Sequence, residues 1–272
     1  MKKENTYHKV IVSFVFLLFT WFLAACAPDT PQPRTALDDQ PARMVSAFFG
    51  LDNELPSLRW KGLDGMPVTF TKRIADPDSL MPEAFTVITR SGKRVTPDHA
   101  TLRPAKEASK RHTVLLIGEF GNEPEDPPVK VGVTGSLTLS GGENAQGLSV
   151  DVTPLKNGPS LVLAYTLSPE ESPFEVPPST KQVVVVLWDG GVTPLEGVTG
   201  ESHRLGYSVE LSDGNIVQPI GLGDIGGDNY EYLYLDTDST ALRVNMKGEL
   251  LIDPRSDANP ATSVDVAGAS QN

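Results

Sequence analysis

The chain has 272 residues and a formal net charge of −12 at pH 7, and its hydrophobic content of 39% is sufficient for a folded core. The acidic balance argues against nucleic-acid binding, because a negative field repels polyphosphate. A single cysteine excludes a disulfide scaffold and any metal site built from several cysteines. The 24 glycines and 23 prolines are typical of a turn-rich chain rather than a helical one.

The N-terminus has the parts of a secretory signal. Three lysines at positions 2, 3 and 9 precede an apolar run over residues 10–25, which ends in small residues. This run is shorter than the roughly 20 apolar residues that a bilayer-spanning helix needs. We therefore predict a signal peptide over residues 1–25, and its removal leaves 247 residues with 20 basic and 34 acidic side chains.

The only cysteine follows this run directly. The sequence Leu23-Ala24-Ala25-Cys26 resembles the lipobox of bacterial lipoproteins, in which the cysteine becomes the acylated first residue after cleavage. The resemblance implies a lipid (palmitate-type) anchor at Cys26 and a place in the cell envelope, and Ala27 at the next position favours the outer membrane if the cell is Gram-negative. Two or more acyl chains give stable anchoring. The alternative is an ordinary signal peptide, or a single-span anchor, with an incidental cysteine.

A tether is predicted after the lipidated cysteine. Residues 26–42 contain four prolines, mixed polar residues and almost no bulky apolar ones. This composition favours an extended, solvated spacer.

From residue 43 onward, short runs of β-branched and aromatic residues alternate with turn residues, which predicts an all-β fold. Only residues 42–51 leave helix and strand open. The strand candidates are residues 66–71, 85–89, 114–117, 129–133, 149–152, 161–165, 182–188, 207–211, 230–235, 242–246 and 263–266.

Two pairs of segments repeat in the same order along the chain. Residues 85–97 align without a gap with residues 207–219, and both read as a β-hairpin with a Ser-Gly or Asp-Gly turn. Residues 131–152 and 244–266 form the second pair, with one extra residue in the second copy. The repetition predicts two tandem domains, at residues 43–167 and, in a more divergent copy, 180–268. The acidic, proline-rich residues 168–179 are the predicted linker.

The first repeat also carries a family resemblance. The stretch Pro67-Val-Thr-Phe-Thr, continuing through Asp76-Pro-Asp-Ser-Leu80 to Phe85-Thr-Val and Gly92, is similar to bacterial Ig-like domains of cell-surface proteins. It departs from their pattern at Thr71, where serine is usual, and by one extra residue before Asp76. The resemblance implies Ig-like β-sandwiches and says almost nothing about activity.

Residues 221–226 spell G-x-G-x-x-G, the glycine pattern of dinucleotide-binding sites. A turn and a predicted strand follow them, so no helix N-terminus is available to hold a pyrophosphate. We therefore interpret the segment as a turn in a β-sandwich and assign no cofactor to it.

Asp253, Asp257 and Asn259 share one short loop and are the candidate metal ligands. Ca²⁺ prefers six to eight oxygen ligands, which acidic loops between strands can supply. The spacing is not that of the twelve-residue helix-loop-helix site, and Asp and Asn are also ordinary turn residues. The turn interpretation is favoured over Ca²⁺ binding.

No catalytic residue can be assigned. The three histidines after the signal peptide, His99, His112 and His203, have no partner at a catalytic spacing, and no G-x-S-x-G segment is present. The sequence therefore favours a protein that is not an enzyme.

Tyr230, Tyr232 and Tyr234 alternate with other residues in one predicted strand and so project from one face. Either the leucines between them face the core and the tyrosines cover the outer sheet or pack between the domains, or the tyrosines form an exposed platform for a glycan or a protein.

The sequence thus predicts a lipid-anchored envelope protein with two Ig-like sandwiches and a non-enzymatic role in surface display, adhesion or assembly with an envelope protein or glycan. The alternatives are a hydrolase or carbohydrate-active protein of the envelope, and a structural spacer stiffened by Ca²⁺.

Overall fold

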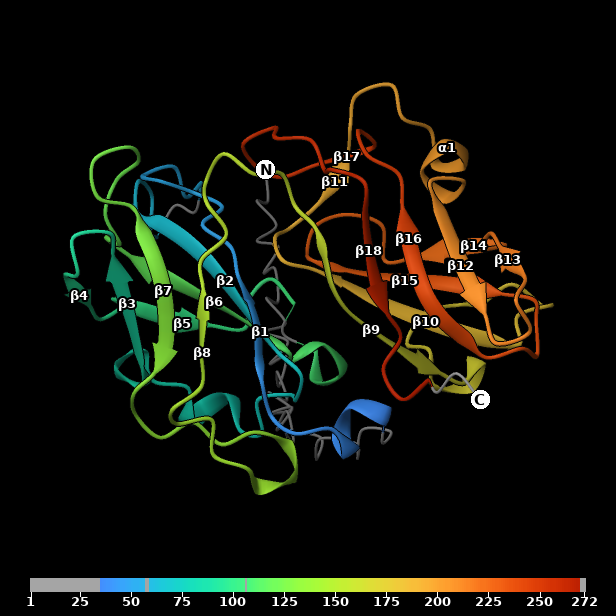
Figure 1. Cartoon of the computed structure of the whole chain (residues 1–272), viewed down its shortest axis with the longest axis horizontal. Coiled ribbons are helices and arrows are strands. Elements are labelled where there is room, and N and C mark those ends of the chain that lie inside the picture. The colour runs from blue at the N-terminus through green and yellow to red at the C-terminus, as the bar shows by residue number, and fades with distance from the viewer. Residues whose placement is uncertain (1–34, 57–58, 106, 270–272) are drawn as a thin grey trace, which may run out of the picture. The chain divides into compact units, whose positions relative to one another are not determined.

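The computed structural model describes residues 35–56, 59–105 and 107–269. The described chain is almost entirely β, with four antiparallel four-stranded sheets and one small two-stranded sheet (Figure 1). The predicted all-β sandwich fold is confirmed. The predicted signal peptide, the residues Leu23–Ala25 of the lipobox-like sequence and Cys26 lie outside the described residues.

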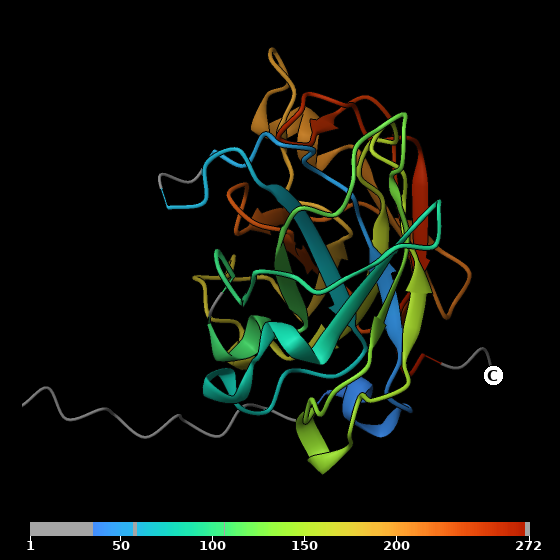
Figure 2. The same ribbon diagram turned by 90° about the vertical axis from the view of Figure 1, so that its left-hand side faces the viewer.

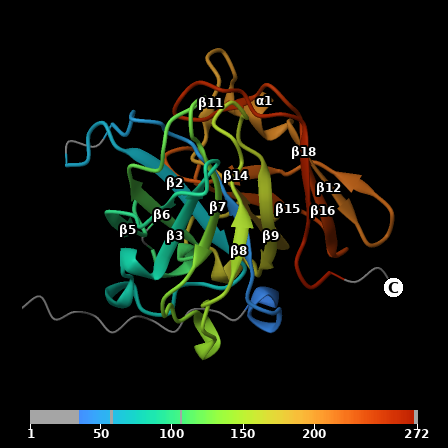
Figure 3. The same cartoon turned by 60° about the vertical axis from the view of Figure 1, so that its left-hand side comes forward.

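Two sheets form the sandwich of the first half of the chain. One has the order β1-β2-β6-β5, with β1 (Met44–Ala47), β2 (Asp64–Phe70), β5 (His99–Thr101) and β6 (Thr113–Gly118). The other has the order β4-β3-β7-β8, with β3 (Phe85–Thr89), β4 (Arg94–Val95), β7 (Pro128–Val133) and β8 (Ser149–Asp151). In Figure 3, which brings this half forward, β3, β7 and β8 lie in front of β2 and β6.

The second half repeats this arrangement. Its first sheet has the order β9-β10-β15-β14, with β9 (Leu161–Leu167), β10 (Gln182–Trp188), β14 (Gly221–Gly223) and β15 (Tyr230–Leu235). Its second sheet has the order β13-β12-β16-β18, with β12 (Tyr207–Leu211), β13 (Ile216–Val217), β16 (Ala241–Met246) and β18 (Thr262–Asp265). The small sheet of β11 (Thr193–Pro194) and β17 (Leu251–Ile252) has no counterpart in the described part of the first half.

Without β11 and β17, the two halves have the same strand order. In each, the first, second, sixth and fifth strands form one sheet, and the fourth, third, seventh and eighth form the other. These are the sheets ABED and C′CFG of the immunoglobulin sandwich. In both halves a parallel bridge also links the region of the first strand to the segment just past the eighth strand, Phe48 to Thr153 and Ala164 to Val266. Both halves of the described chain thus repeat one strand order.

The sequence repeats coincide with equivalent strands. Residues 85–97 and 207–219 contain the hairpins β3–β4 and β12–β13, whose turns hold Gly92 and Gly214 at φ values of +88° and +83°. Glycine tolerates this left-handed conformation because it has no Cβ. The second pair of repeats contains β7–β8 and β16–β18. All the strand candidates coincide with observed strands, and residues 42–51 contain the strand β1.

The predicted boundary between the halves was wrong. Strand β9 was expected in the first domain, but it pairs with β10 in the sheet of the second half. Residues 168–179 therefore connect two strands of one sheet and do not link two domains. The segment includes the 3-10 helix η6 (Pro169–Glu171), and its Phe174 packs edge-on against Tyr232 with ring centroids 5.0 Å apart.

The predicted tether is shorter than residues 26–42. The 3-10 helix η1 (Ala36–Asp39) lies against the body (Figure 2), and Leu37 is only 1% exposed. Lys72 donates to the carbonyl of Asp38 at 3.0 Å, and Ser140 donates to its carboxylate at 3.2 Å. Residues 35–42 are thus part of the folded body, because one leucine and one aspartate find partners that the local composition does not reveal.

Short helices connect several of the strands. The one α-helix of the described residues is α1 (Gly200–Arg204), and the remaining 3-10 helices are η2 (Pro77–Ser79), η3 (Pro82–Ala84), η4 (Ala108–Lys110) and η5 (Ser140–Gly142). In the described part of the chain, no helix has the length and apolar character that crossing a membrane requires.

The buried apolar residues form three clusters. One fills each sandwich, and the third lies on the outer face of the β9-β10-β15-β14 sheet, where Leu37 and Ala105 of the first half pack. This third cluster joins the halves, so residues 35–269 form one compact body.

Candidate functional site

The two halves meet through the same strand positions of each repeat. His112 precedes β6 and Asn229 precedes β15, while Thr113 and Tyr230 are the first residues of those strands. The amide of Asn229 donates to the hydroxyl of Thr113 at 3.0 Å, and the backbone N–H of His112 donates to the hydroxyl of Tyr230 at 3.1 Å. In each half, the residue before this strand contacts the first residue of the equivalent strand in the other half. This reciprocal contact is the kind that two subunits make across a two-fold axis.

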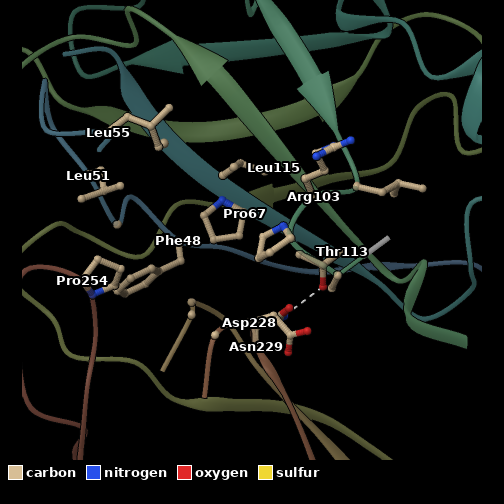
Figure 4. A pocket seen from close by; sticks show the side chains of 18 of the residues that line it. Phe48, Leu51, Leu55, Pro67, Arg103, Thr113, Leu115, Asp228, Asn229 and Pro254 are labelled. Atoms are coloured by element: carbon tan, nitrogen blue, oxygen red, sulfur yellow. Dashed lines mark hydrogen bonds between the residues drawn. The ribbon is translucent and has the colours of Figure 1, made fainter. Parts of the chain in front are cut away.

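A cavity of about 280 Å³ lies beside this contact, with walls from both halves (Figure 4). Its lining is almost entirely apolar. The first half contributes Phe48, Gly50, Leu51, Leu55, Pro56, Gly65, Pro67, Leu102, Arg103, Pro104, Ala105, Thr113 and Leu115, and the second half contributes Gly190, Gly191, Gly227, Asp228, Asn229 and Pro254.

Glycines bring the walls of the cavity close together. A Cβ added at Gly190 would lie 2.8 Å from the Cδ1 atom of Phe48, so a side chain there would push the two halves apart. A Cβ at Gly65 would lie 3.1 Å from Leu55 Cδ1. Because Gly65 has no side chain, the backbone of β2 packs directly against the side chains of Leu51 and Leu55, which line the cavity.

The polar side chains that the second half contributes to the cavity, Asp228 and Asn229, are hydrogen-bonded to other groups of the protein. Asp228 accepts hydrogen bonds from the ammonium of Lys110 at 2.7 Å and from the backbone N–H of Tyr230 at 2.8 Å. Asn229 donates to Thr113 and to the carbonyl of Trp188. These groups hold the two halves together, and their hydrogen-bonding capacity is largely used within the protein.

Lys110 is the centre of a buried ion cluster at this interface. Besides Asp228, it pairs with Asp224, and its ammonium lies 5.7 Å from the ring centroids of Phe174 and Tyr230. Burial alone would lower the pKa of Lys110, but the hydrogen bonds and charges of the two aspartates raise it above the ordinary value. The charge of Asp228 is therefore compensated by a lysine that stays protonated.

Arg103 is the remaining charged residue in the lining. It is exposed, lies two residues after the end of β5, and lines the cavity together with Leu115 (Figure 4). Within residues 35–56, 59–105 and 107–269, its guanidinium group has no ion pair or hydrogen bond. It is thus the charge at this cavity that a ligand can reach.

The three candidate tyrosines do not form an exposed platform. Tyr230, Tyr232 and Tyr234 are 1%, 0% and 2% exposed and belong to the cluster between the halves. Burial raises the pKa of each phenol. Their face of the sheet is covered instead, since the Tyr230 hydroxyl donates to the carbonyl of Lys110 and the Tyr232 ring packs against Phe174.

The candidate metal ligands serve the backbone of their own loop. Asn259 accepts from the backbone N–H groups of Leu250 and Leu251 and donates to the carbonyls of Lys247 and Pro260. Among the described residues, no three His, Cys, Asp or Glu side chains gather in a way that could hold a metal ion.

In the same loop, one oxygen of Asp253 accepts from the N–H groups of Arg255 and Asp257, and the carboxylate of Asp257 lies 3.5 Å from Nε of Arg255. The geometry of this loop therefore supports the turn interpretation.

The histidines lie in separate environments. His99 is in β5, with its ring centroid 5.3 Å from that of Trp60. His112 is buried between the halves, and burial lowers its pKa to about 4, so it is neutral near pH 7. His203 is buried in α1 beside Glu231, at 3.1 Å.

The core of the second sandwich holds a polar network that sequence reasoning missed. The carboxylate of Glu231 is 1% exposed, accepts from the hydroxyl of Tyr207 and lies 3.4 Å from the indole nitrogen of Trp188. Burial and the charge of Glu231 raise the pKa of Tyr207 well above its ordinary value.

The alignment of the two repeats contains the signal for this network. Trp188, Tyr207 and Glu231 stand at the strand positions that Phe70, Phe85 and Val114 occupy in the first half. A glutamate where an inward-facing valine is expected marks a position that needs polar partners.

Two other carboxyl groups are buried outside the cavity lining. Burial raises the pKa of Asp64 to about 6 and that of Asp189 to about 7. Asp64 accepts from the backbone N–H groups of Asn53 and Phe120, and Asp189 accepts from that of Ser160. Both carboxylates bind backbone N–H groups, and Asp189 also lines a separate polar hollow with Asn157, Ser160 and Asn259.

Comparison of the chain with models of protein families and with curated proteins finds no match. Its function is therefore inferred from the fold and from the cavity between the halves.

Proposed function

We propose that this chain is a lipoprotein of the cell envelope, anchored through Cys26, whose two fused Ig-like sandwiches act as a non-enzymatic binding module for another envelope component. The lipobox supports the anchor. The single observation that supports the binding role is the apolar cavity formed jointly by both halves. Concave sites lined by apolar residues with a few polar groups are the usual form of ligand-binding sites.

The lining of the cavity favours binding over hydrolysis. A hydrolase of the envelope needs an acid or a nucleophile beside a cleft, with its protonation state tuned to the task. The buried acids whose pKa is raised by burial, Asp64, Asp189 and Asp253, do not line this cavity, and the Asp228 carboxylate is paired with Lys110. The cavity thus offers contact area and one reachable cation.

The anchor is tested by Cys26→Ser in cells fed a labelled palmitate. We expect the natural chain to carry the label and to fractionate with membranes, and the variant to lose both properties. Ala24→Ser, a small residue beside the cysteine, is the control that should keep the label. A variant that stays membrane-bound would show that the N-terminal segment is a plain hydrophobic anchor.

The binding role is tested by photo-crosslinking in intact cells. A photoreactive residue at Leu51, in the cavity wall, should crosslink an envelope component, whereas one at Ile216, exposed on the edge strand β13, should not. Leu115→Trp, which fills the cavity, should abolish the crosslink. Equal crosslinking from both positions, or no effect of Leu115→Trp, would contradict a role for the cavity.

A further inference from the structure

We propose that the cavity between the halves binds the aliphatic chain of a carboxylic acid, with Arg103 holding the carboxylate at the mouth. This inference rests on the proposed binding function and names its ligand class. It follows from three properties of the site: the apolar walls, the sign of the one reachable charge, and the volume.

The walls select an aliphatic group. Phe48, Leu51, Leu55, Pro67 and Leu115 present carbon atoms to the space (Figure 4), and the polar lining groups of the second half are bonded to protein partners. A ligand that enters must therefore gain its affinity from apolar contact. Each methylene transferred from water to such walls tightens binding about fourfold.

The charge at the mouth selects an anion. Asp228 would attract a cation, but its carboxylate already pairs with Lys110. Arg103 is free of protein partners within the described residues, and a guanidinium group binds a carboxylate through two parallel hydrogen bonds. The overall charge of −12 disfavours anions, so this local cation has to offset the wider field.

The volume limits the length of the chain. At about 30 Å³ per non-hydrogen atom, the share of a water molecule in the liquid, a cavity of about 280 Å³ holds about nine such atoms. A medium-length acid such as decanoate matches this space with its carboxylate outside. Longer chains should gain no further affinity, because their extra methylenes remain in water.

The test uses the full lipidated chain in nanodiscs and a decanoic acid that carries a diazirine near its methyl end. After irradiation, peptides from residues 48–67 and 102–115 should carry the label. Unlabelled decanoate should compete at least tenfold better than decanol or decylamine. Competition should strengthen about fourfold per methylene from hexanoate to decanoate and then level off.

Two kinds of variant separate the head from the chain. Arg103→Gln should weaken competition by decanoate about tenfold and leave decanol unchanged, whereas Arg94→Gln, the same charge change on the exposed edge strand β4, should alter neither. Leu115→Trp and, independently, Leu51→Trp should abolish the labelling of these peptides, provided that each variant melts cooperatively.

Labelling that decanoate does not displace, or decylamine competing as well as decanoate, would overturn the inference. If the probe fails while the crosslink from Leu51 persists, the ligand class is wrong and the binding function stands. If the probe labels the cavity as expected but Leu51 captures no envelope component, the ligand class stands and the proposed partner binding is wrong.

Discussion

At the scale of single residues, the buried carboxyl group of Asp189 carries an electrostatic cost. Asp189 is 3% exposed, and burial raises its pKa to about 7 even though backbone N–H groups hydrogen-bond to it. A carboxyl group whose pKa is higher in the folded than in the unfolded chain stabilises the fold below its unfolded pKa and loses that contribution as pH rises. The relevant window runs from about pH 4 to pH 7.

Asp189→Asn should therefore remove a pH-dependent loss of stability. Asparagine keeps an oxygen that can accept from the N–H of Ser160, and it does not ionise. Relative to the natural chain, the variant should gain on the order of 4 kcal/mol in free energy of unfolding between pH 4 and pH 7. Urea unfolding at pH 4, 5.5, 7 and 8 measures this difference.

The comparison with the natural chain is needed because His112 acts in the opposite direction. Burial lowers its pKa to about 4, so its contribution is full above about pH 6.5 and is lost as pH falls towards 4. That effect is common to both proteins and cancels in the difference. Asp151→Asn, at an exposed position of β8, is the control and should leave the pH dependence between pH 4 and pH 8 unchanged. An Asp189→Asn variant that follows the natural curve would show that Asp189 ionises normally.

The network around Glu231 gives a second prediction at this scale. Tyr207 and Glu231 are buried and hydrogen-bonded, and such a charge-assisted bond contributes about 1.5–3 kcal/mol. A double-mutant cycle of Tyr207→Phe and Glu231→Gln should show a coupling free energy of about this size.

Tyr234→Phe is the matched control for this cycle. Tyr234 lies in the same strand as Glu231 but projects from the other face of the sheet, so its change should add to Glu231→Gln within about 0.5 kcal/mol. Chemical denaturation of the variants measures each term. A coupling free energy below about 0.5 kcal/mol between Tyr207→Phe and Glu231→Gln would mean that the Tyr207 hydroxyl and the Glu231 carboxylate do not interact in solution.

At the scale of elements, the η1 segment shows how a short, polar-looking stretch becomes part of the core. Its composition is that of the predicted tether, but Leu37 enters the cluster between the halves beside Leu163 and Leu167. Leu37→Ala should lower the free energy of unfolding by about 2–5 kcal/mol, the usual cost of truncating a fully buried leucine.

Ala36→Gly, in the same turn, is the control, since it changes the backbone without emptying the cluster. Thermal unfolding of the two variants distinguishes the contributions. If Leu37→Ala melted like the natural chain, residues 35–42 would behave as the solvated spacer that their composition suggests.

At the scale of the whole molecule, the two halves behave as fused subunits. They meet through equivalent positions, and the third apolar cluster lies between them. Residues 153–160 connect β8 to β9, with an exposed turn at Lys156 and Asn157. We therefore expect the two halves to associate through their buried interface even when the chain between them is cut.

We expect two co-expressed fragments, residues 1–156 and 157–272, to co-purify as a one-to-one complex. Tyr232→Ala in the second fragment should weaken the complex, because it removes a buried aromatic side chain from the interface. Tyr234→Phe, which keeps the ring, should not. Size-exclusion chromatography with light scattering reports the stoichiometry. Fragments that fold but remain separate would show that the interface depends on the connection.

The sequence by itself determined the all-β class, the positions of the strands and the duplication. These depend on local signals: alternation of apolar residues, β-branched runs, and glycine at the hairpin turns, all of which are written within a few residues of each other. The signal-peptide and lipobox interpretation also comes from the sequence alone and remains a prediction.

Tertiary structure decided where the halves divide, which residues of the tether fold, and what the three tyrosines do. Strand β9 could be assigned only by its partner β10, and Leu37 only by a sheet more than 120 residues away in the chain. The cavity has the same origin. Its walls come from loops of both halves, and whether facing side chains fill a space or leave it open depends on packing between distant segments, which no local pattern encodes.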